Sequence, residues 1–215
     1  MSNNMHLYYG HDPMCSFCWA YRPVWAEIQE QVVKRFPDIE IVYLMGGLAP
    51  DSDQPMPTAL KDKLMATWRY IQQNIPGTEF NYDFWSAQQP RRSTYPACRA
   101  VMAAKMLGPQ WEQPMILAIQ RAYYLDAQNP SNEDTLLACA ESIGLDPGLF
   151  TRQLHSPDCE AAFAEDRQRS LQLGINSFPS LIISKGKSRY SIPVDYQQAA
   201  LTLEHISEAR SLLQA

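Results

Sequence analysis

Strand-like segments occur near the two ends of this chain, and the long stretch between them has a helical pattern. Near the start, residues 5–9 alternate as a strand does, and residues 39–45 are β-branched and apolar enough to form a buried strand. Near the end, residues 180–184 and 189–192 have strand character and flank a turn at Lys185–Gly186. We therefore expect an α/β protein whose strands come from both ends of the chain.

The middle of the chain, from about Pro50 to Gly174, is typical of helices. Apolar side chains at 4-4-3 spacing share one helix face: Leu60, Leu64, Trp68 and Ile71. We expect further helices at 96–107, 111–128 and 158–173, and a last one at Tyr196–Leu213. A capping box at Ser131–Asp134 predicts the start of another helix, and Asp146–Pro147 predicts the start of a short one.

The resulting order is β, α, β, a helical block, then β, β, α. A βαβ unit and a ββα unit, separated by a helical insertion, form the arrangement of a thioredoxin-like fold with a large all-helical domain between its two halves. We expect the thioredoxin-like domain to comprise residues 1–50 and 170–215, and the inserted helical domain to comprise residues 51–169.

Two cysteines lie where the first strand gives way to a helix. The sequence reads Cys15-Ser16-Phe17-Cys18, after a stretch at Gly10–Met14 that resembles a turn. The first turn of a helix presents unpaired backbone N–H groups and the positive end of the helix dipole, and both favour the reactive thiolate. The second thiol lies one turn further on, close enough to close a disulfide. This placement predicts redox chemistry.

The other cysteines do not extend this pattern. Five cysteines are an odd number and a low density for 215 residues, which argues against a structural disulfide framework and suits a reducing compartment. We expect Cys98, Cys139 and Cys159 to be buried in helices as small apolar side chains. Zinc is the alternative for the first pair, but no second CxxC or CxxH is present and Pro157 interrupts the candidate at 155–159. We expect no metal.

Charge and hydropathy exclude other classes of function. The net charge is −5 and no run of lysine or arginine occurs, so nucleic acid is not an expected partner. No apolar stretch approaches the roughly 20 residues of a membrane span. The polar start of the chain has no secretory signal pattern. We expect a cytoplasmic protein with neither a membrane nor a nucleic acid as partner.

Two prolines make the pattern more specific. Pro23 lies eight residues after Cys15, inside the expected helix, and Phe178–Pro179 directly precedes the strand at 180–184. With them, the sequence resembles the DsbA-like thioredoxin family, and within it the cytoplasmic FrnE-type and kappa-class glutathione transferase relatives. The likeness is carried by residues 12–19, by Ser93–Thr94 before Pro-Ala-Cys-Arg-Ala, and by residues 174–179.

The resemblance implies an activity and a set of site residues. It implies thiol–disulfide exchange in which Cys15 is the exposed nucleophile and Cys18 the more buried resolving thiol. It places a cis-proline at Pro179, opposite the cysteines. The substrate, a protein or small molecule with a thiol or disulfide, would dock at Phe178 and Pro179. We include the groove-lining or packing aromatics Phe17 and Trp19, and His11, a loop residue, as further candidates.

No tightly bound cofactor is implied, and glutathione is a candidate cosubstrate. Reduction or isomerisation is the preferred direction, because a cytoplasmic location favours it over oxidation. Two other functions stay open: a glutathione-dependent transferase or isomerase, whose members typically have serine where this chain has Cys15, and a non-catalytic peptide-binding chaperone or adaptor.

Overall fold

In the computed structural model, which describes residues 4–214, segments from both ends of the chain form one four-stranded sheet. The strand order is β2-β1-β3-β4, with β2 parallel to β1 and with β3 antiparallel to both β1 and β4. The strands are β1 Met5–His11, β2 Ile39–Met45, β3 Ser180–Lys185 and β4 Ser188–Ile192. Because β1 is central and pairs with β3, the last part of the chain completes the sheet that the first part begins. The α/β thioredoxin-like fold is confirmed.

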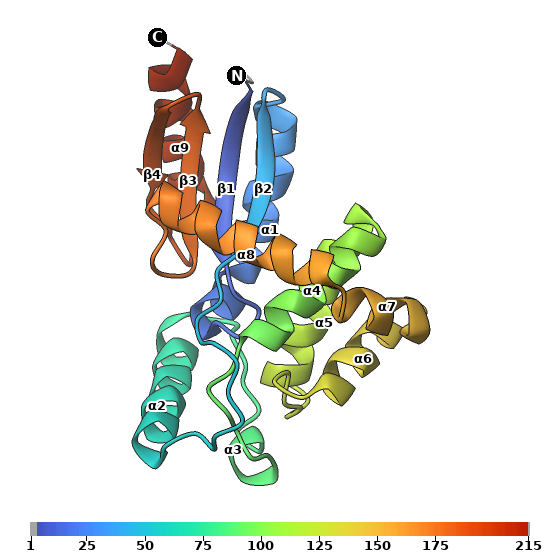
Figure 1. Cartoon of the computed structure of the whole chain (residues 1–215). Coiled ribbons are helices and arrows are strands. Elements are labelled where there is room, and N and C mark those ends of the chain that lie inside the picture. The colour runs from blue at the N-terminus through green and yellow to red at the C-terminus, as the bar shows by residue number, and fades with distance from the viewer. Residues whose placement is uncertain (1–3, 215) are drawn as a thin grey trace.

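Helices cover both faces of the sheet. Helices α1 (Ser16–Arg35) and α9 (Ala199–Gln214) pack together on one face, and α8 (Pro157–Leu173) lies across the other face (Figure 1). The alternation of β1 explains this arrangement: Leu7 belongs to the large core under α1, whereas Tyr8 belongs to a smaller cluster with Leu173 of α8. Each face of β1 is therefore buried, as its apolar sequence requires.

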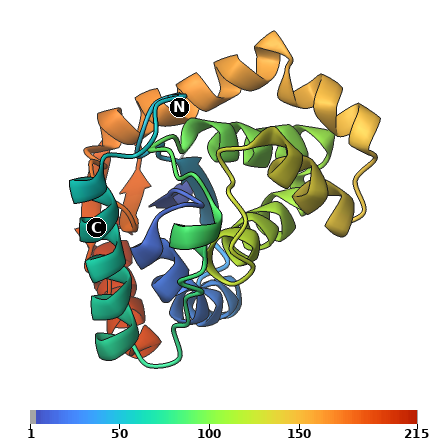
Figure 2. The ribbon, with the colours of Figure 1, turned by 90° about the horizontal axis from the view of Figure 1, so that it is seen from below.

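The helices of the middle stretch surround α4. Four alanines of α4 are fully buried, which allows its neighbours to approach closely, and α4 packs against α5, α6, α7 and α8. Seen from below, α2 lies on one side of the start of α1, and α4 to α7 lie on the other (Figure 2). The helices are α2 Thr58–Asn74, α3 Phe84–Ala87, α4 Tyr95–Leu107, α5 Glu112–Tyr124, α6 Glu133–Ser142 and α7 Pro147–Leu154.

The expected helix at 111–128 is too long at its C-terminal end. Helix α5 ends at Tyr124, and Ala127 has a φ of 52°, which a helix cannot contain. The last helix likewise starts at Ala199 rather than Tyr196, because the Asp195 carboxylate accepts the backbone N–H groups of Gln197 and Gln198 in a turn.

The prediction of a capping box at Ser131–Asp134 is wrong. The Ser131 hydroxyl donates instead to the carbonyl of Ser93, and the N-cap of α6 is Asn132, whose side chain makes no capping bond. A long-range hydrogen bond has thus replaced the local one that the sequence pattern suggested.

The expected domain boundary at 169/170 falls inside α8. One part of this helix packs against α4 and another part packs against β2. It therefore links the sheet to the helical block (Figure 1). The division into 1–50 with 170–215 and 51–169 stays a prediction. Over the described residues, no helix has the length and apolar character needed to cross a bilayer.

The link between α8 and the sheet should depend on pH through Asp166. Its carboxylate accepts the backbone N–H of Met45 at 2.9 Å, and burial raises the pKa of this carboxyl from 3.8 to about 6. A raised pKa means that the fold favours the protonated form, so this contribution to stability is present below pH 3.8 and lost as the pH rises through about 6. We expect Asp166→Asn to remove that loss, which is about 3 kcal/mol for a shift of this size.

Denaturant unfolding of wild type and Asp166→Asn at pH 4 and pH 7 measures this effect. The variant should gain stability over wild type at pH 7 and gain little at pH 4. An equal difference between the two proteins at both pH values would contradict it.

Candidate active site

The cysteine pair forms the first turn of α1. Cys15 is the N-cap, with φ −84° and ψ 114°, and its sulfur accepts the backbone N–H of Cys18 at 3.4 Å. Its own N–H donates to the carbonyl of Asp12 at 3.0 Å, which closes the preceding turn. The Cys15 sulfur thus takes the place of the usual hydroxyl or carboxylate cap and faces the helix N-terminus. Both thiols are free.

The opposite wall of the site comes from the segment before β3. The Cys15 thiol donates to the carbonyl oxygen of Phe178 at 3.3 Å, and the peptide bond between Phe178 and Pro179 is cis. These residues are far apart in sequence, and the pairing of Gly10 with Ser180 between β1 and β3 brings them together. The structure therefore unites Cys15, Cys18, Phe178 and Pro179.

Both thiols are buried. Cys15 is 6% exposed and Cys18 is 1% exposed, so the expectation of an exposed Cys15 is wrong. The physical reason is the contact with Phe178, which turns the Cys15 sulfur toward the β3 segment. Burial raises the pKa of the Cys18 thiol well above its usual range, and the neighbouring Cys15 raises it further. Cys18 is therefore held as a neutral thiol.

Gly46 allows the Phe178 ring to lie where it does. A Cβ atom at Gly46 would lie 1.9 Å from Cζ of Phe178, which is far inside van der Waals contact. The N–H of Gly46 also donates to the carbonyl of His11 at 2.7 Å, so the backbone here cannot move away freely. Sequence reasoning used Gly46 only to end a strand and did not identify this close approach.

Asp12 holds the turn before the cysteines, and sequence reasoning missed this role. Its side chain is fully buried and accepts hydrogen bonds from the backbone N–H of Met14 at 2.8 Å, the N–H of Leu48 at 2.7 Å and the hydroxyl of Thr94 at 2.7 Å. The thiol of Cys98 lies 3.6 Å from the same carboxylate. Burial raises the pKa of Asp12, and these donors oppose the rise. One carboxylate thus joins three separate segments beside Cys15.

The remaining predicted residues lie around the pair in different ways. Phe17 is half-buried, and its ring packs 5.8 Å from that of Tyr196. Trp19 is buried, donates to the carbonyl of Glu79 at 3.0 Å and stacks on Tyr124 at 5.5 Å, so it packs α1 against the insertion.

His11 is not a loop residue as expected. It ends β1 and is buried, and its ring stacks on that of Tyr9 at 5.1 Å. Burial lowers the pKa of His11 to about 3, and the charge of Lys105 lowers it further, so the ring is neutral at physiological pH. The reason for the difference is that β1 continues its pairing with β2 as far as His11 and Met45.

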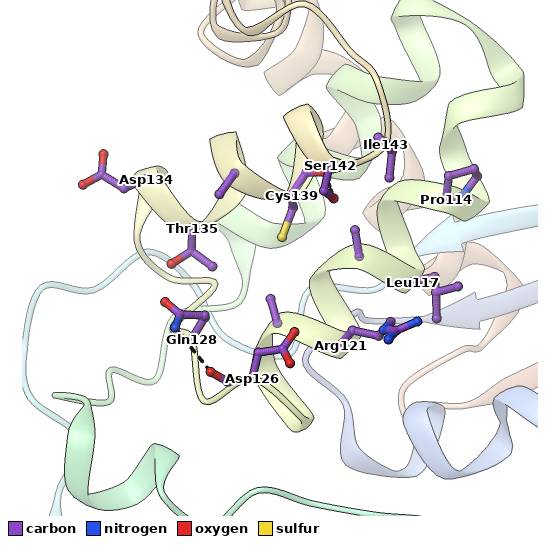
Figure 3. A pocket seen from close by; sticks show the side chains of 13 residues that line it. Pro114, Leu117, Arg121, Asp126, Gln128, Asp134, Thr135, Cys139, Ser142 and Ile143 are labelled. Atoms are coloured by element: carbon purple, nitrogen blue, oxygen red, sulfur yellow. Dashed lines mark hydrogen bonds between the residues drawn. The ribbon is translucent and has the colours of Figure 1, made fainter.

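The other three cysteines are buried in α4, α6 and α8 as expected. The Cys159 thiol donates to the carbonyl of Arg99, and the Cys139 sulfur points into a cavity of about 660 Å³ between α5 and α6 (Figure 3). Within residues 4–214, no three histidine, cysteine or acidic side chains are grouped so that they could hold a metal ion.

A protein-family model described as thioredoxin matches residues 8–198 of this chain. Among solved structures, a candidate protein disulfide isomerase from Nitrosomonas europaea superimposes with a TM-score of 0.84 at 24% identity, covering 97% of this chain and 98% of the other. The cytosolic disulfide reductase DsbM from Pseudomonas aeruginosa, also solved with GSH, gives a TM-score of 0.73 at 22% identity, covering 98% and 100%. At these identities the likeness shows the fold.

Among curated proteins, the ClpXP adapter protein SpxH of Halalkalibacterium halodurans is 26% identical over 182 residues, which are 83% of this chain and 58% of the relative. SpxH of Bacillus subtilis is 26% identical over 178 residues. The chain thus spans less than two thirds of the length of the curated relatives that it matches.

We expect Gly46→Ala to displace Phe178 from Cys15. The added methyl group has no room beside the ring, so we expect about 1–3 kcal/mol of lost stability and a Cys15 that is alkylated faster by iodoacetamide. Gly148→Ala is the control, since its Cβ would meet nothing closer than 3.3 Å. Urea unfolding and mass-resolved alkylation measure both effects. Unchanged stability in Gly46→Ala would show that the Phe178 ring does not occupy this position.

We expect Asp12→Asn to loosen the turn before Cys15. The amide replaces one acceptor oxygen with a donor, which leaves a buried donor without its partner and costs about 1–3 kcal/mol. Asp53→Asn is the matched control because the Asp53 side chain is 99% exposed. Urea unfolding should separate the two variants, and hydrogen exchange should be faster at Met14 and Leu48 in Asp12→Asn alone. Equal stabilities would exclude a supporting role for Asp12.

Proposed function

The chain belongs to the thioredoxin family, and on this basis we propose that it is a thiol–disulfide oxidoreductase that acts through Cys15 and Cys18. One observation carries the proposal: the Cys15 sulfur, the N–H of Cys18 and the carbonyl of Phe178 meet in one place. The N–H of Cys18 points at the Cys15 sulfur from the first turn of α1, while burial keeps Cys18 protonated.

The Phe178 carbonyl supplies more than a contact to Cys15. It lies just before β3, so this carbonyl faces the Cys15 sulfur rather than a neighbouring strand. An extended substrate segment can hydrogen-bond there as an added strand would, which would set its sulfur beside Cys15. Phe178 and Pro179 are therefore our proposed docking residues, with Phe17 at the edge of the site.

The reaction balances as two successive exchanges. The Cys15 thiolate attacks one sulfur of a substrate disulfide, forms a mixed disulfide and releases the other sulfur as a thiolate. Cys18 then loses its proton and attacks the Cys15 sulfur, which forms the Cys15–Cys18 disulfide and releases the second substrate thiol. The substrate gains two electrons and the cysteine pair loses two. The same steps in reverse oxidise a substrate dithiol.

We propose reduction or isomerisation as the direction, in the cytoplasm. The structural neighbour described as a cytosolic disulfide reductase supports this choice, and its second structure, with GSH, supports glutathione as a cosubstrate. The substrate would be a protein or small molecule that carries a disulfide. The proposed reaction uses no metal and no tightly bound cofactor, because sulfur atoms of the chain carry both electrons.

A second candidate function is that of an adaptor. The curated relatives are described as ClpXP adapter proteins, and an adaptor would bind a protein partner at Phe178 and Pro179 without turnover. The kappa-type glutathione transferase reading is weaker, because this chain has a cysteine where those proteins typically have serine.

Reduction of insulin disulfides with glutathione as the electron source tests the proposal. We expect Cys15→Ser to lower the rate at least about a hundredfold, because serine is not ionised at neutral pH. Cys18→Ala should accumulate a mixed disulfide at Cys15, detectable by mass spectrometry. Cys139→Ala is the control, since this buried cysteine lies in α6 away from the pair, and its rate should equal that of wild type.

The outcomes separate the candidates. Wild-type turnover that Cys15→Ser does not reduce would exclude the dithiol mechanism. Absence of turnover, with partner binding unchanged by both cysteine substitutions, would favour the adaptor. Glutathione-dependent isomerase activity that survives Cys18→Ala would favour the transferase type.

A further inference from the structure

A cavity of about 450 Å³ lies between α1 and α5 and reaches the ends of β1 and β2. Cys18 lines this cavity, whereas Cys15 is not among its lining residues. The volume is within the range of small-molecule sites. Its mouth is formed by exposed side chains of α1 and α5: Arg22, Ala26 and Gln113.

Two buried residues that line this cavity have polar atoms without partners. His11 is 1% exposed and neither ring nitrogen makes a hydrogen bond, and Gln120 is 3% exposed with an unpaired side-chain oxygen. Leaving such groups unpaired costs about 1–3 kcal/mol each, so native proteins rarely do so. Both residues line the cavity, so a bound molecule could supply the missing partners.

The cavity between α5 and α6 gives a useful comparison (Figure 3). It is larger and shares Pro114 and Leu117 with the first cavity, so the two adjoin along α5. Among the described residues, however, none that lines it has a buried polar atom without a partner. The cavity beside Cys18 therefore differs from its neighbour in having buried, unpaired polar atoms on two of its lining residues.

The walls favour a flat ring. Tyr9 and His11 stack with an angle of 6° between their planes, and Tyr43 meets His11 edge-on at 85°. The Trp25 indole N–H donates to the Tyr43 hydroxyl at 2.8 Å, so this indole N–H already has its partner. A ring in the cavity, placed against these aromatic side chains, would gain apolar contact.

The charges around the cavity argue against a cationic ligand. Arg22 stands at the mouth, and the field of Lys105 reaches His11. The neutral His11 ring offers one donor and one acceptor, and the unpaired Gln120 oxygen offers an acceptor. A hydroxyl group meets this combination because it both donates and accepts.

We propose that this cavity binds a small planar aromatic molecule that carries a phenolic hydroxyl, with the hydroxyl at His11 and Gln120 and the ring against Tyr9, Trp25 and Tyr43. The bound ring would also contact Cys18. This site is separate from the proposed docking residues Phe178 and Pro179, and its occupancy does not require thiol exchange.

Fluorine NMR with two matched probes tests the proposal: 6-fluoro-2-naphthol, and 2-fluoronaphthalene, which lacks the hydroxyl. We expect wild type to bind the naphthol at least tenfold more tightly than the hydrocarbon. His11→Phe should reduce this preference to less than threefold, because it removes one of the two polar partners of the hydroxyl and keeps a ring. The same variant should raise the melting temperature of the unliganded protein, since it also removes two unpaired nitrogens.

Variants at the mouth of the cavity distinguish probe binding inside it from probe binding elsewhere on the protein. Ala26→Phe should abolish binding of both probes by closing the entrance, and Leu117→Phe should do so from the α5 side. Val33→Phe on the exposed face of the same helix is the control and should bind as wild type does. Cys15→Ser should bind unchanged, so failure of the exchange mechanism would leave this result intact.

Three results would overturn the proposal. These are equal affinity of wild type for the two probes, binding that survives both mouth variants with their folds intact, and displacement of the naphthol by glutathione. The proposal would also be overturned if the naphthol, at millimolar concentration, did not bind to the wild-type protein.

Discussion

The buried carboxylate of Asp12 is the constraint on which the geometry of the cysteine pair depends. Its donors come from the turn before Cys15, from the segment after β2 and from the start of α4. A carboxylate removed from water is costly unless its hydrogen bonds are made. All three segments must therefore be in place together, so the sheet and the helical insertion shape the start of α1 jointly. This coupling explains how a large insertion can be accommodated without separating the site from its support.

The two cysteines of one helical turn face different environments. Cys15 caps the helix and meets a backbone carbonyl from the far end of the chain, whereas Cys18 lies in the core and lines an aromatic cavity. Three tyrosines lie near the pair, and burial raises the pKa values of all three: Tyr9, Tyr124 and Tyr196. At the helix start, the backbone N–H of Cys18 donates to the Cys15 sulfur. This division of environments supports distinct roles for an attacking and a resolving thiol.

The sequence predicted elements well where a local signal sets their limits. Asp146 begins α7 as expected, because its side chain caps the first turn of the helix. Gly174 ends α8 as expected, because its left-handed backbone conformation stops the last turn. The predictions from sequence were wrong where a residue distant in the chain competed with the local signal. Ser131 bonds to Ser93 instead of capping α6, and His11 extends β1 because Met45 pairs with it. The exposure of Cys15 was wrong for the same reason, since its contact with Phe178 is made across the sheet.

The sequence by itself determined the order of strands and helices, the position of the cysteine pair at a helix start, and a net charge of −5 without a basic run. These features follow from periodicity, capping and charge, which act over a few residues. Only the tertiary structure decided that Asp12 would clamp the site, that Gly46 must leave room for Phe178, and that His11 and Gln120 would share a cavity with Cys18. Each of these depends on which distant segments meet when β3 pairs with β1, and no local pattern encodes that meeting.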